Sequence, residues 1–116
     1  MSAITETMGP RVVTIKVELA GGLDILFDGK PQLKVAIAAS SVNDDGAPSI
    51  RMSELITHLG EEVMTDSRKD LFVLDGSIRP GIMVLINEVD WELEGEEECV
   101  LVSGDEVLFV STLHGG

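Results

Sequence analysis

The residues with the clearest chemical potential in this sequence are its last four, Leu113, His114, Gly115 and Gly116. The carboxylate of Gly116 is ionised at neutral pH, because a chain-terminal carboxyl has a pKa of about 3.3–3.7, and it can attack the α-phosphorus of ATP. The resulting acyl-adenylate would react with a thiolate, a persulfide or an amine. Glycine lacks a Cβ, so this end can be threaded into the narrow active site of a partner enzyme. The alternative interpretation is a frayed chain end whose glycines have no function.

The remainder of the sequence offers few reactive groups. No zinc-protease motif, phosphate-binding glycine loop, nucleophile elbow or dinucleotide fingerprint occurs, and the two histidines lack companion metal ligands. His58 falls on the polar face of a predicted helix, where a solvated side chain is expected. We therefore predict that the chain is not an enzyme and binds no cofactor or metal, and that a partner enzyme uses the ATP and supplies the catalysis.

Cys99 is the single cysteine. Val100-Leu101-Val102 follow it, so a small buried hydrophobic side chain is the expected role. Five glutamates nearby should raise the pKa of the thiol and disfavour the thiolate: Glu92, Glu94, Glu96, Glu97 and Glu98. The last three, Glu96, Glu97 and Glu98, either form a docking face for a basic partner or make up a solvated turn.

The composition predicts one folded, acidic domain. The chain has 116 residues, of which 44% are hydrophobic and 3% aromatic, so a core of aliphatic side chains is expected. The 21 acidic and 8 basic residues give a net charge of −13, which would repel nucleic acids and anionic membranes and attract a basic protein. Solubility alone is the alternative explanation of this charge.

The sequence also predicts a location. A single cysteine fits a reducing compartment, and the first ten residues have neither the basic nor the apolar region of a signal peptide. We expect a monomer in the cytoplasm, with the nucleus as a second location.

Hydrophobic periodicity divides residues 11–112 into one domain, between flexible segments at 1–10 and 113–116. Alternation predicts two strands joined as a hairpin, at 13–19 and 33–38, and a loop over 40–49 that ends at Ser49 as a helix N-cap. Apolar residues at helical spacing predict a helix near 50–64. An irregular stretch at 65–80 precedes three further strands, expected at 82–86, 91–93 and 106–111.

The order of these elements, β-β-α-β-β-β, is that of a β-grasp domain of the α+β class, a mixed sheet with one main packing helix. In such a domain the final strand lies inside the sheet, so the Gly-Gly tail would project from the body. We also predict an exposed apolar docking patch near Leu85, Phe109 and Leu113.

Three segments carry a resemblance to a known family: Arg79–Asn87, Asp90–Leu93 and Val107–Gly116. Together they resemble the ubiquitin-related modifier family, the eukaryotic sulfur carriers of tRNA thiolation. The Phe27-Asp28-Gly29 segment also fits this family, whereas the 40–49 loop is longer than its usual pattern.

The resemblance implies a pathway. An E1-like adenylyltransferase and sulfurtransferase would adenylate Gly116, and its rhodanese domain would convert the terminus to a thiocarboxylate. The sulfur would pass through a tRNA thiolation complex to the wobble uridine of cytosolic tRNAs. The family also implies attachment of Gly116 by an isopeptide bond to lysines of proteins such as peroxiredoxins, notably in oxidative stress. The alternatives are a modifier that only conjugates, and a non-covalent acidic interaction domain with incidental glycines.

Overall fold

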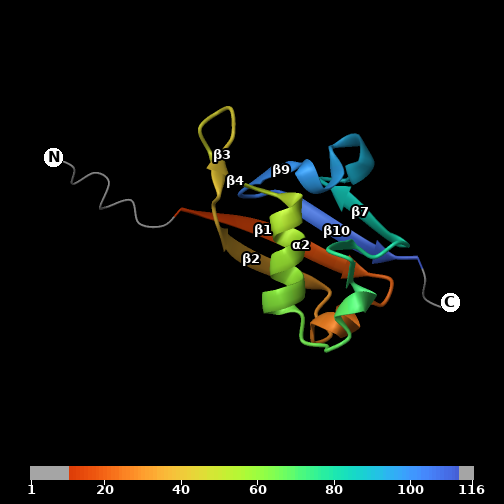
Figure 1. Cartoon of the computed structure of the whole chain (residues 1–116). Helices are drawn as coiled ribbons and strands as arrows, with labels where there is room; N and C mark the ends of the chain where they lie inside the picture. Colours follow the sequence, from red (N-terminus) through yellow and green to blue (C-terminus); the bar gives the residue numbers. More distant parts are fainter. Residues whose placement is uncertain (1–10, 113–116) are drawn as a thin grey trace.

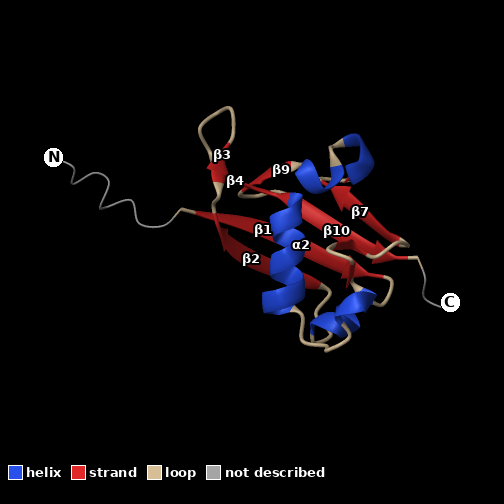
Figure 2. Cartoon of the chain, viewed as in Figure 1, coloured by secondary structure: helices blue, strands red, loops and turns tan. Residues whose placement is uncertain are grey.

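The structure, a computed structural model, describes residues 11–112, so the segments expected to be flexible, 1–10 and 113–116, lie outside it (Figure 1). Its centre is a five-stranded mixed sheet in the order β2-β1-β10-β7-β8. The helix α2 crosses one face of this sheet (Figure 2). The strands are β1 (Val12–Ala20), β2 (Gln32–Ala38), β7 (Ile82–Ile86), β8 (Val89–Asp90) and β10 (Glu106–Ser111).

The pairing of the strands confirms the β-grasp fold. β1 and β2 form the expected antiparallel pair, β10 runs parallel to β1, and β10 is antiparallel to β7. The final strand therefore has a neighbour on each side. A strand held on both edges is a rigid support for whatever chain follows it.

The core lies between the sheet and α2. Alternate side chains of β1 point into it, and Val13, Ile15 and Val17 are fully buried. Phe72 sits at its middle, with ring centroids 5.3 Å from Phe27 and 5.2 Å from Phe109, both in edge-to-face geometry. Such pairs add about 0.5–1.5 kcal/mol each to the burial of the rings.

The predicted helix at 50–64 divides into two parts. α2 spans Met52–His58, and a π-helical turn, η2 (Leu59–Val63), continues it. The amide of Met64 donates to the carbonyl of Leu59 at 2.8 Å, which closes the wide turn. A Cβ on Gly60 would lie 3.2 Å from Val73 Cγ2, so glycine lets the end of the helix approach the chain beside it.

The predicted N-cap at Ser49 is wrong. Residues Pro48–Arg51 form the strand β4, which pairs with β3 (Ser41–Val42) and β9 (Val100–Val102) in a small second sheet. The helix begins after Arg51, whose amide donates to Glu54 Oε2 at 2.8 Å. That bond is one half of a capping box.

The expected strand at 91–93 is also wrong. Trp91–Leu93 forms a 3-10 turn, η4, and the strand lies just before it, at β8. Asp90 Oδ1 accepts a hydrogen bond from the amide of Glu92, which favours the turn over an extended chain. The remaining short elements are η1 (Leu23–Phe27), η3 (Lys69–Leu71), β5 (Val73–Leu74), β6 (Ser77–Ile78) and η5 (Glu96–Glu98).

Within residues 11–112, no helix combines the length and the apolar character needed to cross a membrane.

Candidate functional site

The candidate site begins where β10 ends. Ser111 pairs with Ile82, and the amide of Thr112 donates to the carbonyl of Gly81 at 2.9 Å. The hydroxyl of Thr112 also donates to that carbonyl oxygen. These contacts fix the last described residues against β7. The predicted reactive and threading residues, Leu113, His114, Gly115 and Gly116, follow directly and lie outside the described residues.

Gly21, which follows β1, lies against the other side of the end of β10. Its φ of +71° is in the left-handed region, and a Cβ there would lie 2.4 Å from the carbonyl oxygen of Ser111. Only glycine can occupy this position without displacing the backbone. The root of the tail therefore lies between Gly21, which allows the close approach after β1, and Gly81, which accepts its hydrogen bonds just before β7.

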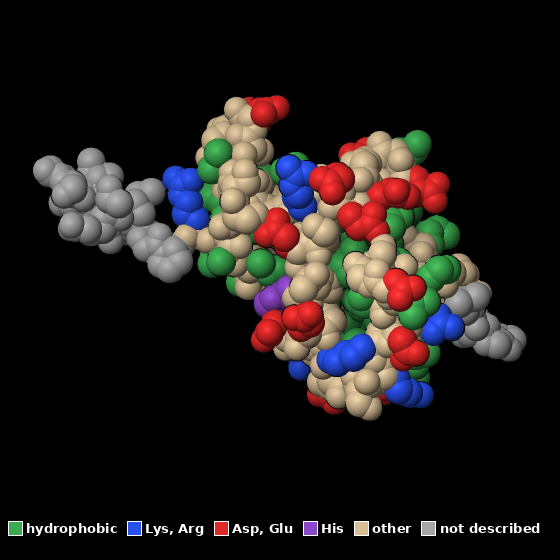
Figure 3. All heavy atoms as spheres, viewed as in Figure 1, with side chains coloured by type: hydrophobic (Ala, Val, Ile, Leu, Met, Phe, Trp, Pro, Cys, Tyr) green, Lys and Arg blue, Asp and Glu red, His purple; other side chains and the backbone are tan. Residues whose placement is uncertain are grey.

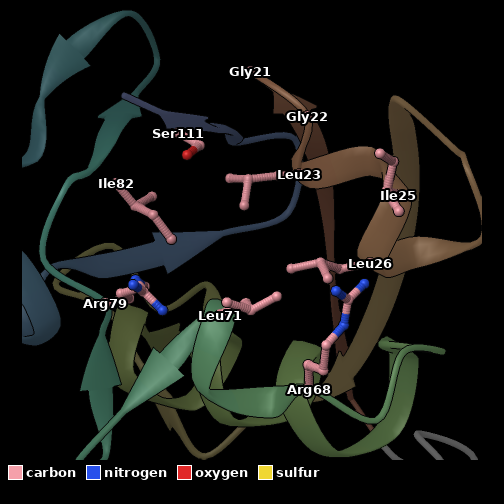
Figure 4. A pocket seen from close by; sticks show the side chains of 10 residues that line it. All are labelled: Gly21, Gly22, Leu23, Ile25, Leu26, Arg68, Leu71, Arg79, Ile82 and Ser111. Carbon is pink, nitrogen blue, oxygen red and sulfur yellow. The ribbon is translucent and has the colours of Figure 1, made fainter. Parts of the chain in front are cut away.

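A pocket of about 340 Å³ opens beside this root (Figure 4). We call it the tail-root pocket, and its apolar wall comprises Leu23, Ile25, Leu26, Leu71 and Ile82. The side chain of Ile25 is 65% exposed, which is high for an isoleucine. Ser111 also lines the pocket, so its occupant would lie next to the departing tail.

Two arginines border the tail-root pocket, in a chain with only eight basic residues. Arg68 is held by Asp66, with Nε and Nη2 donating to the two carboxylate oxygens at 2.9 and 2.8 Å. These bonds hold the pKa of the Asp66 carboxyl well below its usual range. Arg79 donates to the carbonyl of Asp70 at 3.2 Å and has no carboxylate partner among residues 11–112. Its charge is available to an incoming acidic group.

The outer face of the sheet carries a second apolar area. Leu108 pairs with Leu85, and Val110 pairs with Met83, so these four side chains share the face opposite α2. Met83 is 44% exposed and the other three are half-buried. The prediction that Leu85 belongs to an accessible face is consistent with this position. Its role in docking stays a prediction.

Phe109 does not belong to that face. It is fully buried and packs against Phe72, so the prediction that it forms part of an exposed patch is wrong. Residues 107–110 are all apolar, so these four residues alone do not show which alternate side chains face the core. Glu106 was the available signal, because a charged residue marks the outer face and places Leu108 and Val110 beside it.

The acidic segment Glu96–Glu98 forms η5, and two of its three carboxylates are engaged within the chain. Glu98 makes an ion pair with Arg51, and Ser77 donates a hydrogen bond to Glu97. These contacts tie η5 to β4 and to β6. Glu96 is exposed and has a positive φ of 53°. Docking at Glu96, Glu97 and Glu98 stays a prediction.

Cys99 is half-buried and packs against the core. Burial raises the pKa of its thiol, and the charges of Glu94 and Asp105 raise it further. The direction of the predicted shift is confirmed, although burial is the main cause and Glu94 is the only contributor among the five glutamates expected. A thiol with a raised pKa is a weak nucleophile at neutral pH.

No group of three or more potential metal ligands occurs within the described part of the chain.

Comparisons with known proteins match this arrangement. The model of a family described as Urm1 (Ubiquitin related modifier) matches residues 14–116. Ubiquitin-related modifier 1 of Coccidioides immitis is 50% identical over 105 residues, covering 90% of this chain and 89% of that protein. Its counterpart in Schizosaccharomyces pombe is 46% identical over 104 residues, covering 90% and 100%. The solution structure of Urm1 from Trypanosoma brucei has a TM-score of 0.69 at 36% identity, covering 90% of this chain and 97% of that one.

Proposed function

Because the chain belongs to the ubiquitin-related modifier family, we propose that it carries sulfur as a thiocarboxylate on Gly116. The family is one of ubiquitin-like modifiers, which act as carriers and substrates of other enzymes. One observation carries the proposal. The final strand is held on both edges within the sheet, and it ends at Ser111, five residues before Gly116, close to Gly21 and with Thr112 hydrogen-bonded to Gly81.

The chemistry needs three steps. The Gly116 carboxylate attacks the α-phosphorus of ATP, a carboxylate oxygen–phosphorus bond forms, and pyrophosphate leaves. The terminal sulfur of a cysteine persulfide then attacks the acyl carbon, and AMP leaves with its electron pair. A second thiolate of the enzyme attacks the enzyme-bound sulfur of this acyl disulfide. The thiocarboxylate departs, and the enzyme retains a disulfide.

The chain's contribution is to present the acyl group without obstruction. Glycine at 115 and 116 leaves the backbone accessible, and the carboxylate is already ionised at neutral pH. Cys99 is not suited to compete for the activated acyl group, because its thiol is half-buried and has a raised pKa. The catalytic groups belong to the E1-like enzyme and its rhodanese-type domain, and ATP is that enzyme's substrate.

The thiocarboxylate has two uses in this proposal. Its sulfur is donated to the wobble uridine of cytosolic tRNAs through a tRNA thiolation complex. In oxidative stress, its acyl carbon is instead attacked by a lysine amine of a target such as a peroxiredoxin, sulfide leaves, and an isopeptide bond to Gly116 forms. Membership of the family supports both uses.

The tail-root pocket is the docking point that we assign to the activating enzyme. An enzyme that takes the tail must cover the surface beside Ser111, and this surface combines an exposed Ile25 with the guanidinium of Arg79, which has no carboxylate partner among residues 11–112. The pocket fits an apolar side chain of the enzyme flanked by a carboxylate.

The activation step is tested by ATP–pyrophosphate exchange with the purified E1-like enzyme. Labelled pyrophosphate should enter ATP only when the chain is added, and a variant that lacks Gly116 should give no exchange. A variant with Glu92→Lys, a distant surface change, is the folded control and should exchange normally. Exchange that persists without Gly116 would contradict the assignment of the reactive carboxylate.

A further inference from the structure

A second surface lies at the edge of the sheet formed by β2. The amide of Leu19 donates to the carbonyl of Pro31, and the amide of Ala39 donates to the carbonyl of Arg11. In an antiparallel ladder such bonds recur at every second residue, so odd-numbered residues of β2 bond to β1. The amides and carbonyls of Gln32, Lys34, Ala36 and Ala38 therefore point away from the sheet.

This edge is open to another chain. β2 is the last strand of its sheet, and within residues 11–112 no strand pairs with its outer side (Figure 1). Edge strands are usually protected by charged side chains, prolines or bulges. In the second half of β2 the outward positions are Ala36 and Ala38, both small and exposed. Lys34 is the only charged residue in the strand.

A groove of about 390 Å³ runs between this edge and α2. Its floor includes the half-buried Ile37, and its far wall is formed by Thr57 and His58 of the helix. Four further residues complete the lining: Ser53, Glu54, Glu61 and Glu62. Figure 3 shows acidic side chains gathered beside a histidine on this side of the molecule.

The acidic rim of the groove carries negative charge that is not neutralised by ion pairs among residues 11–112. Glu54 is oriented by Ser40 Oγ at 2.7 Å and by the amide of Arg51 at 2.8 Å, and it is the first carboxylate of the row. Glu61 and Glu62 are exposed, and neither forms an ion pair among residues 11–112. The groove thus joins unpaired backbone groups, an apolar floor and uncompensated negative charge.

We propose that this groove binds an extended segment of a partner protein that carries apolar residues and lysine or arginine at every second position, so that both kinds of side chain share the face toward α2. The segment would add to the sheet as a strand beside β2 and hydrogen-bond to Ala36 and Ala38. Its apolar side chains would rest on Ile37, and its basic side chains would face Glu54, Glu61 and Glu62. The surface would recognise the modifier non-covalently, separately from activation of Gly116.

The open edge of β2 lies far from the root of the tail along β1. Ala38 pairs with Val12 at the start of β1, whereas Val110 of β10 pairs with Ala20 at its end. Eight residues of strand separate these positions along β1, or roughly 26 Å at a rise of about 3.3 Å per residue. A receptor at the groove would therefore leave the tail accessible, including after conjugation to a target lysine.

A second copy of the chain is a poorer occupant. Pairing two β2 edges would bring two acidic rims together in a protein with a net charge of −13. Like charges placed face to face disfavour such an interface. Charge complementarity instead selects a basic segment.

The test is selection from a random-peptide display library against the immobilised full chain. We expect enriched peptides in which Val, Ile or Leu and Lys or Arg stand two or four positions apart, on one face of the added strand. When the best peptide binds, the changes in NMR chemical shift of the chain's amides should map to residues 32–38 and to α2. Ala36→Pro should weaken binding about tenfold or more, because it removes an outward amide without breaking a bond to β1.

The charge of the rim is tested by the double variant Glu61→Lys with Glu62→Lys. It should weaken the same peptide about tenfold at low salt, and the effect should shrink as salt is raised. The matched control, Glu92→Lys, should bind normally. The proposal would be overturned if no peptide is enriched, or if the consensus lacks basic residues. It would equally be overturned if the chemical-shift changes map elsewhere, if binding survives both variants, or if the chain forms a dimer through β2. Pyrophosphate exchange should be unchanged in all these variants, because none of them alters the tail. If the parent chain itself fails to support exchange, the proposed function is contradicted, whereas the proposal for the groove is not.

Discussion

The tail-root pocket and the groove at β2 share no lining residue and have opposite charge. The first is an apolar hollow bordered by Arg68 and Arg79, whereas the second is an apolar strip bordered by Glu54, Glu61 and Glu62. The net charge of −13 therefore gives the sign of the groove but not that of the tail-root pocket. The difference indicates two classes of partner: an enzyme with an acidic contact near the tail, and a basic segment at the edge.

Removal of Gly116 should distinguish the roles of the two surfaces most completely. Activation by the E1-like enzyme should be lost, because the attacking carboxylate is moved and its backbone shortened, whereas binding of a basic peptide at β2 should stay within twofold. The thermal midpoint should not change. Pyrophosphate exchange, peptide titration and calorimetry are the three measurements. A truncated chain that unfolds would show that the tail is part of the core.

Substitution of Gly21 should have the next largest effect, on the tail root alone. Gly21→Ala places a Cβ 2.4 Å from the carbonyl of Ser111 in a left-handed backbone, and we expect a loss of about 3 kcal/mol in the free energy of unfolding. Gly22→Ala is the control, since its Cβ would meet no atom within 4 Å, and it should cost about 1 kcal/mol. Urea denaturation measures both. Equal losses would mean that the contact with Ser111 is unimportant.

Reversal of charge at Arg79 should weaken docking of the activating enzyme. Arg79→Glu should raise the KM for the chain in pyrophosphate exchange about tenfold and leave kcat near its original value, since the group binds without touching the reacting atoms. Arg11→Glu, which makes the same charge change at the far end of β1, should alter KM less than twofold. Equal effects of the two variants would indicate that net charge alone controls the encounter.

Asp66 should give the smallest effect. Its pKa is lowered in the folded chain by Arg68, so the stabilisation is complete above its unfolded pKa of about 3.9, decreases below that value and is lost only as the pH falls through the lower folded-state pKa. Asp66→Asn should therefore lower the thermal midpoint slightly at neutral pH, with the difference from the parent chain vanishing in acid. A difference that does not shrink as the pH is lowered from 4 to 2 would point to a cause other than the carboxylate charge.

The sequence predicts the framework of this fold well, because the main strands and the helix carry strong periodicity. The alternation in β1 and the continuous apolar run in β7 are both present in the structure as strands. The short pairings were missed for a physical reason. β4 and β9 contain only four and three residues, and they are stabilised by contacts between segments about fifty residues apart.

The candidate site could be predicted only in part. The reactive end follows from Gly115-Gly116, but the pocket beside it joins residues from four separate segments, and no local pattern reveals that. Phe109 was placed on the wrong face because both faces of β10 are apolar. The groove at β2 depends on which amides point outward, which is fixed by the register with β1.

The central claim is that sulfur is carried on Gly116, and mass spectrometry of the intact chain tests it most directly. The chain is incubated with its E1-like enzyme, ATP and a persulfide donor. We predict that the mass rises by the difference between one sulfur and one oxygen, and that fragmentation places the change on Gly116. An unchanged mass, or a sulfur that remains when Gly116 is deleted, would contradict the claim.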